Sequence, residues 1–148
     1  MDNDAAMRIA LEEARAALAH GDVPVGAVVV RGDAVIARRH NERELTNDPT
    51  AHAEVLALRD ASAALGSWRL DDCTLVVTLE PCLMCAGAAL SSRIGTLVYG
   101  AADLKAGATA SLYSVLTDPR LNHNPPIVHG VLAGECGELL TGFFSDRR

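Results

Sequence analysis

The sequence predicts an α/β fold of three layers, α-β-α, around one mixed sheet of five strands. Short runs of β-branched and apolar residues recur along the chain, and segments with apolar side chains at helical spacing lie before, between and after them. The order starts with a helix and a hairpin and then alternates strands with helices, which places helices on both faces of the sheet.

The first half of the chain begins with a predicted helix over residues 4–20, where apolar residues recur at helical spacing and a glycine follows. Two β-branched runs, 25–30 and 34–37, are predicted strands of a hairpin, because an Arg-Gly-Asp turn separates them. Residues 40–49 are polar and are predicted to form a loop. A helix is then expected over residues 51–65, with a glycine as its stop.

The second half begins with residues 74–79, an apolar run that predicts a strand buried on both faces. Pro81 follows this strand, and we expect a helix to start at Cys82. Residues 96–99 are predicted to form a further strand and residues 101–110 a loop rich in Gly and Ala. The remaining predicted elements are a short helix over 112–116, a strand over 127–131 and a closing helix over 135–144.

The bulk composition predicts one folded domain, residues 1–148, because 49% of the residues are hydrophobic and 22% are charged. Charged residues interrupt every apolar run, and the N-terminus is acidic rather than basic. We therefore expect no membrane span, no secretory signal and a cytoplasmic location.

The net charge of -6 argues against holding long nucleic acids on a basic face. Two basic pairs, Arg38-Arg39 and Arg147-Arg148, are candidates for a local basic patch, although a solvated surface pair is the simpler interpretation of each.

Two of the four cysteines, Cys82 and Cys85, have the spacing that places both sulfurs on one face at the start of a helix, where the partial positive charge favours thiolates. A closed structural zinc site needs a second such pair. Cys73 and Cys136 are not spaced like one, and we interpret both as small buried side chains. His52 can supply a third ligand, and a fourth position open to water is the arrangement of catalytic zinc.

Glu54 stands two residues after His52, so in a regular helix the two side chains would diverge by about 200°. The pair can face a common cavity only if His52 lies at the irregular entrance of its helix, directly after Asp48-Pro49-Thr50. We therefore expect His52 at the very start of the helix.

The pattern His-x-Glu followed by Pro-Cys-x-x-Cys is similar to the signature of the zinc-dependent cytidine and adenosine deaminases. From about Met7 to Phe144 the chain resembles more closely the family of bacterial tRNA-specific adenosine deaminases. The stretches that carry this resemblance are Asp22-Val23-Pro24-Val25-Gly26-Ala27, Asn41, Asp48-Pro49-Thr50-Ala51-His52-Ala53-Glu54, Thr78-Leu79-Glu80-Pro81-Cys82-Leu83-Met84-Cys85-Ala86-Gly87-Ala88, Ser92-Arg93-Ile94-Gly95 and Asp103-Leu104-Lys105-Ala106-Gly107-Ala108.

The resemblance implies a cytidine-deaminase-like fold and one zinc ion per subunit, held by His52, Cys82 and Cys85. It implies that Glu54 is catalytic and is not a ligand: its carboxylate moves protons while adenosine becomes inosine. It also implies a homodimer that acts on the wobble adenosine of a tRNA anticodon stem-loop.

The resemblance implies three substrate contacts: the side chain of Asn41, the backbone of Ala53, and Val23 as part of the pocket wall. Asp103 and Lys105 either orient a loop over the site or pair with each other. His123 is equally compatible with an RNA-facing or a structural role. Phe143 and Phe144 are interpreted as core residues rather than RNA contacts.

Three functions remain open from the sequence. The first is deamination of wobble adenosine in tRNA. The second is deamination of a free nucleobase or nucleoside, of the guanine or cytosine type, by the same groups. The third, a zinc-stabilised binding module without activity, would leave Glu54 unexplained.

Overall fold

The computed structural model describes residues 1–147, so Arg148 of the second basic pair lies outside the described residues. Five strands form one sheet in the spatial order β2-β1-β3-β4-β5. β1 is antiparallel to β2 and β3, whereas β3, β4 and β5 run parallel, so the predicted mixed sheet is confirmed. The strands are β1 (Gly26–Arg31), β2 (Ala34–His40), β3 (Thr74–Leu79), β4 (Thr96–Ala101) and β5 (Ile127–Val128).

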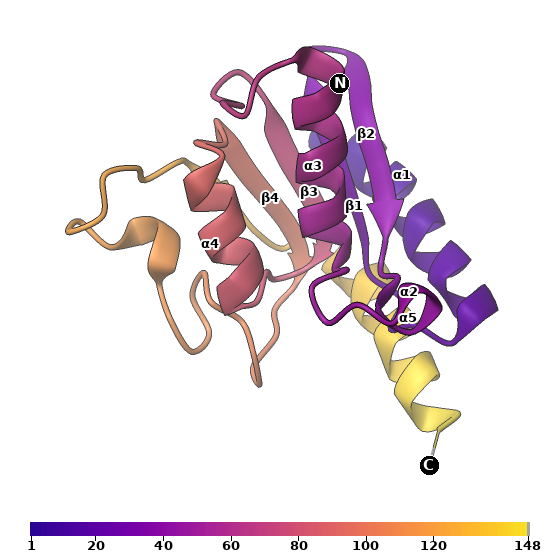
Figure 1. Cartoon of the computed structure of the whole chain (residues 1–148). Coiled ribbons are helices and arrows are strands. Elements are labelled where there is room, and N and C mark those ends of the chain that lie inside the picture. The colour runs from indigo at the N-terminus through magenta and orange to yellow at the C-terminus, as the bar shows by residue number, and fades with distance from the viewer. Residues whose placement is uncertain (148) are drawn as a thin grey trace.

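Helices cover both faces of the sheet, which confirms the three predicted layers (Figure 1). One face carries α1 (Asn3–Ala16), which continues as the 3-10 helix η1 (Ala17–His20), and α5 (Ala133–Ser145). The other face carries α3 (Ala53–Leu65) and α4 (Leu83–Ser91).

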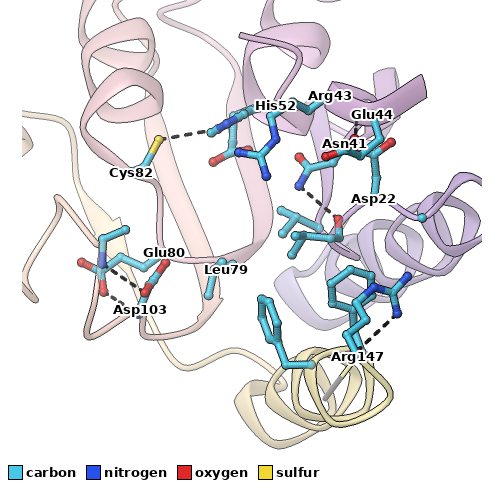
Figure 2. Close-up of a pocket in the computed structure, with 17 residues that line it drawn as sticks. Asp22, Asn41, Arg43, Glu44, His52, Leu79, Glu80, Cys82, Asp103 and Arg147 are labelled. Atoms are coloured by element: carbon cyan, nitrogen blue, oxygen red, sulfur yellow. Dashed lines mark hydrogen bonds between the residues drawn. The ribbon is translucent and has the colours of Figure 1, made fainter. Parts of the chain in front are cut away.

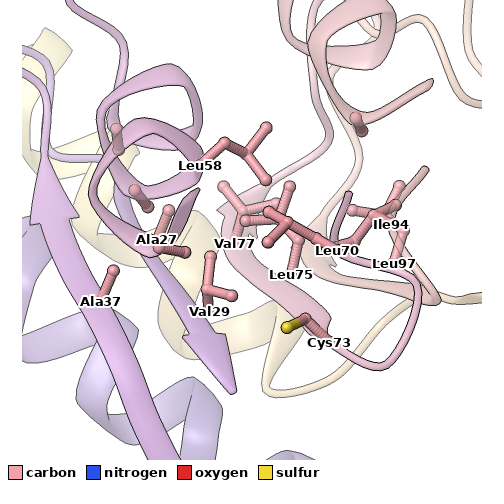
Figure 3. Packing of buried hydrophobic residues seen from close by; sticks show 14 of the residues in the cluster. Ala27, Val29, Ala37, Leu58, Leu70, Cys73, Leu75, Val77, Ile94 and Leu97 are labelled. Atoms are coloured by element: carbon pink, nitrogen blue, oxygen red, sulfur yellow. The ribbon is translucent and has the colours of Figure 1, made fainter. Parts of the chain in front are cut away.

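The sheet separates two apolar clusters, because successive residues of its central strands point to opposite faces. Val28, Val76 and Val98 pack toward α1 and α5. Val29, Leu75 and Leu97 pack toward α3 and α4 (Figure 3). Burial on both faces explains why strands such as 74–79 read as continuous apolar runs in the sequence.

The helix α1 crosses β1 at very short range. A Cβ atom added to Gly26 would lie only 1.9 Å from the carbonyl oxygen of Ala10 in α1. Only glycine therefore fits this position, and it brings the first layer down onto the sheet.

The predicted loop over 40–49 is wrong in part, because it contains the short helix α2 (Arg43–Thr46). The buried carboxylate of Asp22 accepts the backbone N–H groups of Glu44 and Leu45, at 2.8 and 3.2 Å. These are the N–H groups that a helix start leaves unpaired. A cap supplied from a distant part of the chain thus orders a segment that is polar in sequence.

The helix predicted over 112–116 is also wrong. The backbone N–H groups of Leu112 and Val115 donate to the carbonyls of Gly107 and Ala108, and only the 3-10 helix η2 (Val115–Thr117) follows. The other differences are at element ends: β2 and β4 extend beyond the predicted residues 37 and 99, β5 ends before 131, and α5 starts before 135. Among the described residues, none of the helices combines the length and apolar character that a bilayer span needs.

Candidate active site

The three predicted metal ligands meet where α3 and α4 begin. His52 is the N-cap residue of α3 and has an extended backbone, with φ -79° and ψ 147°. Cys82 is the extended N-cap residue of α4, and Cys85 lies in its first turn. The Nδ1 atom of His52 lies 3.6 Å from Sγ of Cys82 and 3.4 Å from Sγ of Cys85. The expected placement of His52 at an irregular helix entrance is therefore confirmed.

These ligand atoms have the spacing that zinc requires. With Zn–N bonds of about 2.0 Å and Zn–S bonds of about 2.3 Å, tetrahedral geometry separates the nitrogen from each sulfur by about 3.5 Å. All three donor atoms lie within 4.8 Å of one another, and imidazole nitrogen and thiolate are donors that zinc prefers. His52, Cys82 and Cys85 can thus hold one ion, and a set of three protein ligands is that of catalytic zinc.

The protonation of these groups is strongly coupled. Hydrogen bonds with Cys85 and with His52 lower the pKa of Cys82 to about 4. The bond to Cys82, together with burial, raises the pKa of the Cys85 thiol far above its usual range. The bond to Cys82 also raises the pKa of His52. Cys85 therefore keeps a proton that a metal ion must displace, which makes metal affinity depend on pH.

Glu54 lines a cavity of about 430 Å³ that His52 and Cys82 also line. Figure 2 shows these last two side chains at the cavity. The side chain of Glu54 belongs to the first turn of α3, and the residue is only 4% exposed. Burial raises the pKa of this carboxyl group. A buried carboxyl group at the wall of a cavity, next to a metal-ligand set, is suited to carrying protons.

Asn41 connects the other two residues predicted to bind substrate, Val23 and Ala53. Its Oδ1 accepts the backbone N–H of Ala53 at 2.8 Å. Its Nδ2 donates to the carbonyl of Val23 at 3.0 Å (Figure 2). Val23 and Asn41 line the cavity. Ala53 is fully buried, and its N–H is engaged by Asn41. Contacts of these residues with a substrate stay predictions, but their placement around the start of α3 is now defined.

Two other elements complete the cavity. Arg43 and Glu44 of α2 line it, and Phe143 and Phe144 of α5 line it opposite them together with Arg147. Phe143 is buried, as expected of a core residue. The core interpretation of Phe144 is wrong, because this residue is 54% exposed. The guanidinium of Arg147 lies 3.5 Å from the centre of the Phe143 ring. The C-terminal helix thus brings an aromatic and cationic surface to the site.

The two arginines at the cavity differ from the predicted basic pair Arg38-Arg39, which lies outside it and is bound to acidic side chains. Arg38 forms ion pairs with Glu12 and Glu13. Arg39 forms ion pairs with Glu42 and Asp60. Within residues 1–147, Arg43 and Arg147 form no ion pair and both line the cavity. Of the two predicted basic pairs, only the second therefore contributes a cation to the site.

Sequence reasoning missed Glu80 as a functional residue and named it only within a stretch that carries the family resemblance. This residue is 1% exposed, and its carboxylate accepts hydrogen bonds from the loop 103–111, including the N–H groups of Asp103 and Ala110, both at 3.0 Å. Burial opposes ionisation of Glu80, but these bonds, with those from Ser111, outweigh it and lower its pKa to about 2. One feature of the sequence could have indicated this role of Glu80. A carboxylate directly after a buried apolar strand is itself close to the core and needs hydrogen-bond partners.

Two residues whose roles were left open make structural contacts within the chain. Asp103 orients its loop, because its Oδ1 accepts the N–H groups of Lys105 and Ala106, both at 3.1 Å. His123 holds the carbonyl of Ile94 through Nε2, at 2.7 Å. Cys73 and Cys136 are buried, as expected.

Comparison with known proteins places this site in a family. The model of the MafB19-like deaminases matches residues 1–148. A tRNA-specific adenosine deaminase from Bacillus subtilis is 48% identical over 142 residues, which are 96% of this chain and 88% of the relative. Another, from Haemophilus influenzae, is 49% identical over 144 residues, covering 96% of this chain and 83% of the relative.

Solved structures agree with this placement. One, from a study of A-to-I editing by tRNA:A34 deaminases, has a TM-score of 0.88 and 45% identity, covering 92% of this chain and 99% of the other. A guanine deaminase from Bacillus subtilis has a TM-score of 0.68 and 34% identity, with coverage of 99% and 94%. The fold is therefore cytidine-deaminase-like, as the sequence predicted, and the chain belongs to the MafB19-like deaminases and, by its relatives, to the tRNA-specific adenosine deaminases.

Proposed function

We propose that the protein hydrolyses the adenine amine of the wobble adenosine in a tRNA anticodon stem-loop, giving inosine and ammonia. One observation carries the chemistry: His52, Cys82 and Cys85 form a metal-ligand set at a cavity that Glu54 also lines. The relatives at 48% and 49% identity support tRNA adenosine as the substrate, since their names give that specificity.

Zinc held by the three ligands supplies a Lewis acid that activates water at neutral pH. Glu54 accepts a proton from the water that attacks C6 of adenine and delivers it to the adjacent ring nitrogen. It then takes the remaining proton from the hydroxyl group that has added to C6 and transfers it to the exocyclic amine, so that the C6–N bond breaks, ammonia leaves and C6 becomes a carbonyl carbon. Its burial keeps bulk water away from this carboxyl group while the proton moves.

The rest of the cavity holds the nucleotide. Asn41 and Val23 contact the base, and the backbone of Ala53 at the start of α3 is the contact to the base edge. Arg43 and Arg147 supply positive charge at the cavity of an otherwise acidic chain, which suits the phosphates next to an extruded nucleotide. The protein acts as a homodimer, which its exposed apolar side chains Leu104 and Leu112 support, and works in the cytoplasm where tRNA is modified.

The test offers three substrates to the zinc-loaded protein: an anticodon stem-loop with a wobble adenosine, free guanine, and cytidine. Mass spectrometry then looks for inosine, xanthine and uridine. Inosine in the stem-loop, and its absence with Glu54→Gln, is the expected result. Turnover of guanine alone would assign the protein to the free-base reaction of its guanine deaminase neighbour. No turnover of any substrate, with zinc bound, would favour a binding module.

A further inference from the structure

The segment from Asp103 to Ser111, called here the 103–111 loop, forms part of the cavity wall without helical or sheet structure of its own. Asp103 and Ala106 line the cavity. Apart from one isolated bridge at Gly107, the loop consists of turns and irregular backbone. Loops of this kind are among the more mobile parts of a protein unless specific contacts hold them.

The contact that holds this loop is the carboxylate of Glu80. Six donors reach its two oxygens, and every one belongs to the 103–111 loop. Oε1 accepts from the backbone of Asp103 and the hydroxyl of Ser111, and Oε2 accepts from the backbone N–H groups of Thr109, Ala110 and Ser111 at 3.0 to 3.2 Å and from the hydroxyl of Thr109 at 3.3 Å. The carboxylate thus replaces the backbone partners that the loop lacks.

The close fit of the loop around this carboxylate is visible at Gly107. A Cβ atom added there would lie 2.3 to 2.5 Å from the carboxyl atoms of Glu80. The loop also pairs with the chain just after Glu80, because Gly107 bridges Cys82 and the N–H of Ala108 donates to the carbonyl of Pro81 at 2.8 Å. Figure 2 shows Glu80 and Asp103 side by side at this edge of the cavity.

The metal ligands, in contrast, are positioned by their own helices. His52 accepts the first helical bond of α3, from Leu56 at 3.0 Å, and Cys82 accepts that of α4, from Ala86 at 2.8 Å. The loop meets this framework at the backbone of Pro81 and Cys82. The first helical bonds of α3 and α4 do not involve the loop, so its displacement would change the shape of the cavity before it changed the ligand set.

We propose that Glu80 is a positioning residue that fixes the 103–111 loop as a cavity wall and so controls substrate binding. The substrate-dependent part of this inference rests on the proposed deaminase function. Glu80 acts through the loop and takes no part in proton transfer, which Glu54 performs.

The test compares zinc-loaded wild type with Glu80→Gln, which keeps the shape but turns one acceptor oxygen into a donor that faces loop N–H groups. Hydrogen exchange of the loop amides is expected to rise about tenfold or more. With the anticodon stem-loop, KM is expected to rise about tenfold to a hundredfold, while kcat stays within about threefold, because bonds to a charged group are lost from the binding wall only. Zinc per chain is expected to stay at the wild-type value.

Glu13→Gln is the matched control, because Glu13 is a hydrogen-bonded carboxylate that partners Arg38 and His40 away from the cavity. It should leave loop exchange and KM unchanged. Ser111→Ala, which removes one hydroxyl donor, is expected to raise loop exchange and KM by a smaller factor. It replaces Glu80→Gln as the test variant if Glu80→Gln does not fold.

Unchanged loop exchange in both variants, or a loss of zinc and kcat at unchanged KM, would overturn the proposal. The exchange measurement needs no substrate. If wild type deaminates only a free base, the tRNA assignment fails while the KM comparison is made with that base.

Discussion

Glu80 also couples the stability of the fold to acid. Its pKa is lowered from an ordinary 4.5 to about 2, so the folded state holds the ionised form more strongly than the unfolded chain does. This difference corresponds to about 3 kcal/mol of stabilisation, fully present above about pH 4.5 and lost as the pH falls toward 2. Between about pH 6.5 and pH 3, about 2 kcal/mol should disappear. Glu80→Gln removes this pH-dependent contribution.

The assay is urea unfolding of wild type and Glu80→Gln at several pH values, followed by far-UV circular dichroism because Trp68 is 62% exposed and is a poor fluorescence probe. A chelator is present throughout, so that metal release contributes equally to both proteins. The advantage of wild type should shrink on acidification, by at most about 1.4 kcal/mol per pH unit. An advantage that stays constant within about 0.5 kcal/mol down to about pH 3 would refute the assignment of a strongly acidic Glu80.

Three further predictions concern the frame of the site. Asn41→Ala leaves a fully buried backbone N–H without its acceptor, and urea unfolding should show a loss of about 2 kcal/mol; a loss below about 0.5 kcal/mol would contradict the bridging role. Gly26→Ala should destabilise by about 3 kcal/mol through its clash with α1, while Gly137→Ala, in open space on α5, should stabilise by up to about 1 kcal/mol; equal effects would argue against the close approach. Cys82→Ala should abolish stoichiometric zinc binding, measured by elemental analysis, whereas Glu54→Gln should retain it; zinc in the first or none in the second would contradict the ligand set.

Features that depend on local pattern were predictable from the sequence. The strand 74–79 and the helix 53–65 are long apolar or amphipathic segments with glycine or proline at their ends. The convergence of His52, Cys82 and Cys85 was predictable from the Cys-x-x-Cys spacing together with the resemblance to the deaminase signature, and the expected irregular start of α3 followed from the spacing of His52 and Glu54.

Features that depend on contacts between distant residues were not predictable from the sequence. Helix α2 exists because Asp22 caps it, and the segment 112–116 is not helical because its N–H groups bond back to Gly107 and Ala108. Nothing in the sequence around Glu80 indicates that its partners lie at 103 and 109–111. Such hydrogen bonds join residues that are distant in sequence and become neighbours only in the fold. The spacing of residues in the sequence does not reveal these partners.

The ligand set joins parts of the chain that are 30 residues apart, on two different helices. An ion held there acts as a removable crosslink: it binds the folded protein, where the three donors converge, more tightly than the unfolded one, where they do not. The free energy of unfolding then increases with the logarithm of free zinc once zinc exceeds its dissociation constant. Melting temperature measured against zinc concentration therefore reports the affinity of the site even where no substrate is known.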